Sequence, residues 1–181
     1  MIKRPVIIVS ALLLLSGSAL AESKPSQPYA GQDKRTVSSL SPADLTAISK
    51  GQGWGLAKPA ELNGYPGPIH VLELADRLEL SKAQISQVRE IYSKMNANAR
   101  RIGKAFIQSE AELDALFKTG SATPKALKRA LAKTSQLRAD LREAHLDAHI
   151  RTVPILTQHQ RHLYAQLRGY SNKGSHSGHA H

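Results

Sequence analysis

Two long helical segments separated by a strong stop signal constrain the fold of this chain more than any other feature. From residue 85 to residue 117, apolar residues recur at steps of three and four, the spacing of an amphipathic helix. The run Lys118-Thr119-Gly120-Ser121 ends this helix, and Thr123-Pro124 begins a second one with a favoured N-cap residue and proline at N1. The second helix continues to about residue 153. Because the connection is short, we expect an antiparallel hairpin with arms of roughly 55 and 45 Å at ~1.5 Å per residue.

The apolar stripes of both helices are heptad-like, so each predicts packing along a partner helix. The first helix begins after Ser81, a capping serine three residues before Gln84. Its stripe comprises Ile85, Val88, Tyr92, Met95, Ala99, Ile102, Phe106, Leu113, Leu116 and Phe117. The second stripe comprises Leu127, Leu131, Thr134, Leu137, Leu141 and Ala148. The hairpin is longer than a compact bundle requires, so we expect one side of it to be left for a second subunit or a client.

Shorter helices flank the predicted hairpin. Residues 69–78 form an amphipathic pattern whose apolar side comprises Val71, Leu74, Ala75 and Leu78. Pro154 breaks the second long helix, and Thr157 with Gln160 forms another capping box at the start of a last helix. Residues 171–181 cannot bury enough apolar surface to fold, so they are expected to form a disordered tail that carries histidines.

Residues 22–67 hold most of the glycines and prolines and predict an extended N-terminal arm with short helical pieces. Ser41-Pro42-Ala43-Asp44 is expected to start one piece. Gly51-Gln52-Gly53-Trp54-Gly55 is too glycine-rich for a helix, and its lone tryptophan is expected to anchor the arm on the helical core. The predicted fold class is all-α: an elongated antiparallel helical hairpin with short flanking helices in residues 68–170, after the extended arm and before the disordered tail.

The first 21 residues are expected to be a secretory signal peptide. Lys3 and Arg4 precede the apolar run of residues 5–15, and Ala19-Leu20-Ala21 supplies small residues before a cleavage site at Glu22. The apolar run is short for a membrane span, and no later segment approaches the ~20 apolar residues that a span needs. We therefore expect a protein outside the cytoplasm without stable membrane insertion after cleavage, the alternative being an uncleaved anchor.

Charge and composition narrow the classes of partner. Cleavage removes two of the positive charges and leaves a net charge of about +9 from the +11 of the whole chain. The chain has an export signal and only eight aromatic residues on which bases could stack, so nucleic acid is not expected as a partner. Anionic membrane surfaces or acidic, unfolded polypeptides are expected instead. The absence of cysteine excludes disulfides, thiolate metal sites and cysteine nucleophiles. A metal site must therefore use histidine, methionine, carboxylate or amide ligands.

His145 and His149, hereafter the histidine pair, stand where the second stripe would carry leucines. Residues at i and i+4 lie one turn apart, so both imidazoles can bind one metal ion. In an antiparallel hairpin that turns near Ser121, Met95 and Asn96 lie opposite the pair. A site with Met95 would suit Cu(I), and a site with a carboxylate or water would suit Zn(II), Ni(II) or Co(II). The alternative is that both histidines are packed residues with hydrogen bonds, and the nearby charges of Arg142 and Arg151 disfavour a cation.

Further histidines are candidate ligands. His159 and His162 are spaced i, i+3 on the last helix and approach the histidine pair if that helix folds back, or else are polar residues of its capped turn. The tail contributes His176, His179 and His181. Glu143 and Asp147 are one turn apart but have no nucleophile motif beside them, so we interpret them as a solvated face with ion pairs. His70 with Glu73 is expected to be a pair on a helix surface. We predict no catalytic residue, no enzymatic activity and no organic cofactor.

The two capped starts, Leu80-Ser81-Lys82-Ala83-Gln84 and Leu156-Thr157-Gln158-His159-Gln160, fit the pattern Leu-Thr/Ser-x-x-Gln at the two ends of a helical hairpin. With a signal peptide ahead, the sequence resembles the Spy/CpxP family of periplasmic proteins, whose relatives include the heavy-metal resistance and sensor proteins of the CnrX and ZraP types. The resemblance covers about residues 68–170. It implies a curved helical hairpin that forms a homodimer in the periplasm and has no enzymatic activity.

The resemblance leaves two functions open. Some members bind or sense transition metals (Zn, Cu, Ni or Co) in the envelope response to metal stress, and we predict this function, with a membrane-bound regulator as a further partner. Others are ATP-independent chaperones that hold unfolded clients on a basic helical surface, which is the alternative. The residues expected to serve the alternative are Arg89, Lys94, Arg100, Arg101, Lys104, Lys128, Arg129, Lys133 and Arg138.

Overall fold

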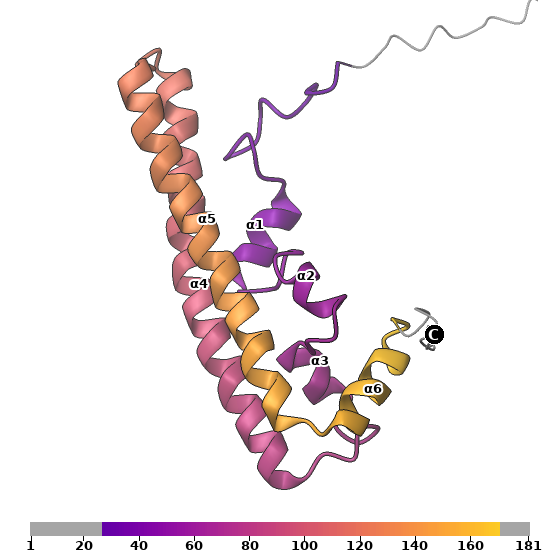
Figure 1. Ribbon diagram of the computed structural model, residues 1–181. Coiled ribbons are helices and arrows are strands. Elements are labelled where there is room, and N and C mark those ends of the chain that lie inside the picture. The colour runs from indigo at the N-terminus through magenta and orange to yellow at the C-terminus, as the bar shows by residue number, and fades with distance from the viewer. Residues whose placement is uncertain (1–26, 171–181) are drawn as a thin grey trace, which may run out of the picture. The chain divides into compact units, whose positions relative to one another are not determined.

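All regular elements of the described chain are helices. The computed structural model describes residues 27–170, and the chain divides into two units, residues 1–30 and residues 31–181, of which the second contains every described helix. Figure 1 shows two long helices and a series of short ones. The predicted all-α class is therefore confirmed. No helix in the described part of the chain combines the length and apolar character needed to cross a membrane.

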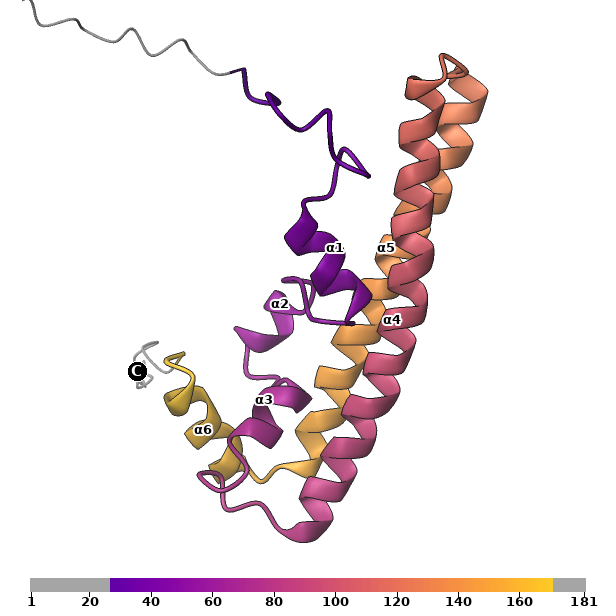
Figure 2. The same ribbon diagram turned by 180° about the vertical axis from the view of Figure 1, so that it is seen from behind.

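The hairpin consists of α4 (Lys82–Lys118) and α5 (Pro124–Thr152), which lie side by side and antiparallel (Figures 1 and 2). Ser81 and Gln84 form the predicted capping box at the start of α4, each side chain accepting the other's backbone N–H. Gly120 follows α4 with a φ of +67°, a conformation that glycine adopts without strain. Thr123 caps α5 by accepting the N–H of Ala126. The helix ends predicted from these local signals are confirmed.

Three short helices follow one another along one side of the hairpin (Figure 2): α1 (Pro42–Ser49) and α2 (Lys58–Glu61) in the arm, and α3 (Pro68–Glu73) directly after it. The first hydrophobic core forms between the arm and the hairpin. It comprises Val37, Leu40, Ile48 and Leu56 from the arm and Ala99, Ile102, Phe106 and Leu141 from the hairpin. The predicted short helical pieces are therefore present, and the arm covers part of the apolar face of the hairpin.

Trp54 anchors the arm as predicted. Its ring centroid lies 6.0 Å from that of Phe106, and its Nε1–H donates to Asp44 at 2.8 Å. The guanidinium of Arg138 lies over the Trp54 ring, 5.2 Å from its centroid. The hydrogen bonds from Ser41 and Trp54 lower the pKa of Asp44. Trp54 thus joins the cap of α1 to both helices of the hairpin.

The helix predicted over residues 69–78 is shorter than expected, because α3 ends at Glu73. From Leu74 the chain continues as turns, and Glu79 has a φ of 49°, which interrupts the helical path before α4. The predicted apolar contacts nevertheless form, since Val71 and Leu78 are both buried. They belong to a second core, which comprises Val71, Leu78, Val88, Leu156 and Tyr164.

Pro154 ends α5 as predicted, and the chain passes through η1 (Val153–Ile155) into α6 (Gln158–Leu167). Thr157 and Gln160 form the second predicted capping box. The two motif glutamines meet: the Nε2 of Gln84 donates to the Oε1 of Gln160 at 2.8 Å, and the Nε2 of Gln160 donates to the Leu78 carbonyl at 3.2 Å. Each glutamine therefore caps its own helix and also ties the starts of α4 and α6 together.

Phe117 and Leu131, which the apolar stripes placed in the interior, are 61% and 45% exposed. Both lie on the part of the hairpin nearest to the α4–α5 turn. The arm bonds α4 there only through Ser38 to Asp114 and Ser39 to Glu110, and its short helices lie farther from the turn. The stripes therefore predict both helices correctly, but among the described residues no helix covers the last turns of α4 and the first turns of α5.

Candidate metal centre

The histidine pair lies in the last turns of α5 and is buried, as its place on the apolar stripe predicted. His145 is 4% exposed and His149 is 9% exposed. The Nε2 atom of His145 has no hydrogen-bond partner within the described chain. Burial, together with the charge of His149, lowers the pKa of His145. His145 is therefore a neutral imidazole at neutral pH with an unpaired buried nitrogen, which the hydrogen-bonded packing alternative does not explain.

His149 is oriented by the arm. Its Nδ1 lies 2.7 Å from the carbonyl oxygen of Tyr65, and a carbonyl can only accept, so Nδ1 carries the proton and donates it. The proton on Nδ1 leaves the lone pair on Nε2. Metal-binding histidines characteristically donate their other ring N–H to a carbonyl or carboxylate, which fixes the tautomer and the ring orientation. The arrangement at His149 is of this kind.

Glu61, the last residue of α2, connects this centre to α6. Its Oε1 accepts the hydroxyl of Tyr164 at 2.6 Å and the Nε–H of Arg168 at 3.3 Å, and its Oε2 accepts the Gly67 N–H at 3.1 Å. Oε2 also lies 3.7 Å from the Nδ1 of His149. Burial and the bond to Glu61 raise the pKa of the Tyr164 phenol, which stays protonated and donates. The carboxylate thus lies beside His149 and is itself paired with Arg168.

Gly67 closes the arm over His149. A Cβ at this position would lie 3.0 Å from Cε1 and 3.2 Å from Nε2 of the imidazole, closer than ordinary van der Waals contact. The sequence did not predict the role of Gly67 in covering the imidazole. Sequence reasoning also missed Glu61 and Tyr65, because no motif marks either residue and Tyr65 contributes only its backbone carbonyl.

Met95 and Asn96 lie on α4 at the predicted level of the hairpin. Met95 lines a groove with Ala144 and Ala148. Each alanine precedes one histidine by one position and therefore points about 100° away from it around α5. The Nδ2 of Asn96 donates to the carbonyls of Lys50 and Gly51, at 2.9 and 3.2 Å, so this amide holds the arm.

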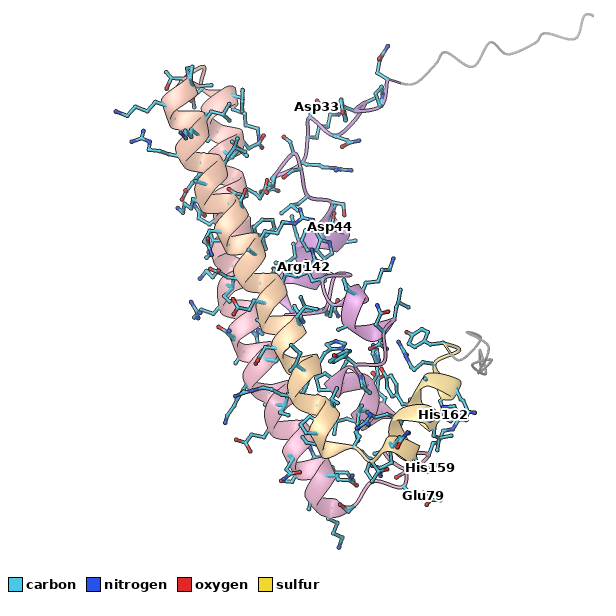
Figure 3. The ribbon with its side chains drawn as sticks, in the orientation of Figure 1. Asp33, Asp44, Glu79, Arg142, His159 and His162 are labelled. Carbon is cyan, nitrogen blue, oxygen red and sulfur yellow. The ribbon has the colours of Figure 1, made fainter. Side chains whose placement is uncertain are left out.

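Among the described residues, His159 and His162 do not form a metal-binding group with the histidine pair. His159 and His162 are exposed on α6 (Figure 3), and His162 contacts Gln166 on its own helix. His176, His179 and His181 lie outside the described residues. Within residues 27–170, no three histidine, aspartate or glutamate side chains are grouped so as to hold a metal ion. The described part of the centre therefore offers two imidazole nitrogens, while the oxygens of Glu61 are occupied by other donors.

The predicted surface pairs are confirmed for Asp147 and His70, whereas the exposed Glu143 has no ion pair within the described chain. Asp147 lies 3.5 Å from Arg151 on the exposed face of α5, and His70 lies 2.9 Å from Glu73 on α3. Arg142 is exposed (Figure 3), so solvent screens the positive charge that would oppose a cation. The ion pair with Asp147 offsets the charge of Arg151 in the same way.

The protonation of His145 predicts a pH dependence of stability. Because the pKa of His145 is lower in the folded chain than its ordinary value of 6.5, the unfolded chain binds the proton first as the pH falls. The free energy of unfolding should therefore decrease between about pH 7 and pH 5. Urea unfolding should show a smaller decrease for His145→Leu than for the wild type. The exposed control His162→Leu should keep the wild-type profile, and parallel profiles for all three proteins would contradict a neutral buried His145.

Comparison with known families gave a match. Residues 63–162 match the family model described as heavy-metal resistance, a span that includes the turn over His149, the whole hairpin and the histidine pair. Comparisons with curated proteins and with solved structures gave no match. The matched span covers more than half of the chain and overlaps most of the region that carries the Spy/CpxP resemblance. The chain belongs to the heavy-metal resistance family, within the Spy/CpxP-like superfamily.

Proposed function

We propose that this protein binds a transition metal through the histidine pair and senses or buffers that metal in the envelope response to metal stress. The observation that carries the proposal is the unpaired, buried Nε2 of His145, one turn from a histidine whose tautomer leaves its own Nε2 free. Neutral imidazoles suit Zn(II), Cu, Ni(II) and Co(II). The family match to heavy-metal resistance supports the same function.

The surrounding residues fit a bound cation. The carboxylate of Glu61 lies 3.7 Å from the Nδ1 of His149 and is paired with Arg168 at 3.3 Å, so this ion pair brings no net positive charge next to His149. The Tyr65 carbonyl holds the Nδ1 proton of His149, which increases the basicity of the ring toward a metal. The arm therefore belongs to the proposed centre as much as α5 does, although it contributes no direct ligand.

Location and assembly extend the proposal. We place the protein in the periplasm after cleavage of the signal peptide, whose residues lie outside the described range, because members of the family are typically extracytoplasmic. A second copy of the chain, in a homodimer, and a membrane-bound regulator are the proposed partners.

The nine basic residues expected to hold unfolded clients are all exposed, but the four on α5 point in different directions around the helix. Metal binding is therefore the better-supported function.

Calorimetric titration tests the proposal. Zn(II), Ni(II), Co(II), Cu(II) and anaerobic Cu(I) are titrated into the mature chain and into the same chain truncated after Tyr170. Submicromolar binding of at least one metal to both chains is expected, because both imidazoles are buried on one helix and the Tyr65 carbonyl fixes the ring of His149. The His145→Ala/His149→Ala variant should lose this binding, and the exposed control His159→Ala/His162→Ala should retain it. Binding that requires the tail, or that survives in the His145→Ala/His149→Ala variant, would contradict the proposed centre.

A further inference from the structure

The segment from Glu61 to Gly67, hereafter the bridging segment, contacts both His149 and α6. On the side of α5, the Tyr65 carbonyl accepts the Nδ1–H of His149 at 2.7 Å. A Cβ on Gly67 would lie 3.0 Å from Cε1 of the same imidazole, so the backbone of Gly67 covers the ring. On the side of α6, Glu61 accepts the Tyr164 hydroxyl at 2.6 Å. The bridging segment therefore joins the candidate metal centre to the last helix of the described chain.

Tyr164 is the residue by which α6 holds the part of the bridging segment that covers His149. It is 2% exposed, and its oxygen has two partners in the segment. The hydroxyl donates to Oε1 of Glu61 and accepts the N–H of Gly67 at 3.3 Å. The same N–H also donates to Oε2 of Glu61 at 3.1 Å. Hydroxyl, carboxylate and amide thus form a closed set of hydrogen bonds at Gly67, the residue that lies against the imidazole.

α6 is anchored at two separate places. At the start of the helix, Gln160 bonds the Leu78 carbonyl and the side chain of Gln84. One turn farther on, Tyr164 bonds the bridging segment, and its ring packs in the second core. Replacement of Tyr164 by phenylalanine keeps the ring and the first anchor. It removes only the hydroxyl that reaches the bridging segment, so we expect the variant to fold.

We propose that Tyr164 is a positioning residue of the metal centre, and that metal binding and the docking of α6 stabilise each other. The proposal rests on the proposed function, because it concerns a metal bound by the histidine pair. The hydroxyl acts on His149 through Gly67 and the Tyr65 carbonyl, which hold the imidazole in one orientation before a metal binds. By linkage, a metal that binds this orientation must in turn stabilise the bridging segment and its bonds to α6.

Zinc titration of the full mature chain tests the positioning role. We expect Tyr164→Phe to weaken Zn(II) binding by about tenfold or more, the usual effect of losing a group that orients a metal-binding histidine. Tyr65→Phe is the matched control, because it removes a hydroxyl from a 43% exposed ring in the same segment and keeps the carbonyl. This control should leave the affinity within about twofold. The visible spectrum of bound Co(II), which depends on coordination geometry, should change in Tyr164→Phe alone.

Hydrogen exchange measured by nuclear magnetic resonance tests the linkage. Saturating Zn(II) should slow the exchange of the α6 amides by about fivefold or more in the wild type, and much less in Tyr164→Phe. A further measurement needs no metal. The Nδ1 proton of His149 should exchange faster in metal-free Tyr164→Phe than in the metal-free wild type or Tyr65→Phe, because the bridging segment is then held less firmly. Circular dichroism checks that both variants fold.

Equal zinc affinities of Tyr164→Phe and the wild type, or equal weakening by Tyr65→Phe, would overturn the positioning role. Exchange of the α6 amides that zinc leaves unchanged in the wild type would overturn the linkage, whether or not any variant folds. Zinc binding that survives in His145→Ala/His149→Ala would contradict the proposed function. Equal exchange rates of the His149 Nδ1 proton in the metal-free wild type and Tyr164→Phe would contradict the positioning of the ring by itself, so the two failures are distinguishable.

Discussion

Replacement of Phe106 by alanine is expected to lower the free energy of unfolding by about 3–5 kcal/mol. The ring is 0% exposed and lies at the centre of the first core, with its centroid 6.0 Å from that of Trp54. Its removal leaves a cavity between the hairpin and the arm, and Trp54 loses its aromatic contact. Urea unfolding followed by circular dichroism measures the change.

Phe117→Ala is the matched control for this prediction. It makes the same substitution in the same helix, three turns farther on, at a side chain that is 61% exposed. We expect a change within about 0.5 kcal/mol, as for ordinary surface substitutions. Similar losses for both variants would mean that the tip of the hairpin is covered in solution, and small losses for both would mean that the arm does not pack as described.

Replacement of Glu61 by alanine is the second change with a large expected effect, about 3 kcal/mol of unfolding free energy. The carboxylate accepts hydrogen bonds from the Tyr164 hydroxyl, the Arg168 guanidinium and the Gly67 N–H. Its removal takes the acceptor from the buried hydroxyl and the ion-pair partner from Arg168, while the Gly67 N–H keeps only its bond to the Tyr164 oxygen at 3.3 Å. The connection between α2 and α6 is lost with it. Thermal and urea unfolding measure the loss.

A double-mutant cycle with Tyr164→Phe isolates the central bond. Tyr164 is 2% exposed and its hydroxyl lies 2.6 Å from Glu61, so the two single changes should not be additive. Glu73→Ala is the control, because Glu73 makes an exposed pair with His70 only, and it should cost less than about 1 kcal/mol. Additive losses for Glu61 and Tyr164 would contradict the direct bond between them.

The helix boundaries were predictable because they depend on neighbouring residues. Ser81 with Gln84, Thr123 with Pro124 and Thr157 with Gln160 carry their capping chemistry within three positions of the chain, and the structure places a helix start at each. The burial of the histidine pair was predictable for a similar reason, since it follows from the periodicity of one helix. Local signals therefore account for most of the fold.

The surroundings of the histidine pair were not predictable, because they join distant parts of the chain. His149 meets the Tyr65 carbonyl 84 positions away, and Tyr164 meets Glu61 103 positions away. Both contacts depend on how the arm packs on the hairpin, which no local pattern specifies. The prediction for Phe117 was wrong for the same reason. Its place on the apolar stripe predicted burial, but the arm does not extend far enough along α4 to cover it.

Nitrogen chemical shifts of the imidazole rings test the metal centre most directly. In proton–nitrogen correlation spectra of the nitrogen-15-labelled mature chain titrated with Zn(II), or with Cu(I) if Zn(II) does not bind, we expect the Nε2 signals of His145 and His149 to shift together. The Nδ1 proton of His149 should remain bound to nitrogen, because it donates to the Tyr65 carbonyl. Shifts confined to the exposed or tail histidines, or direct metal contact at the Nδ1 of His149, would contradict the account.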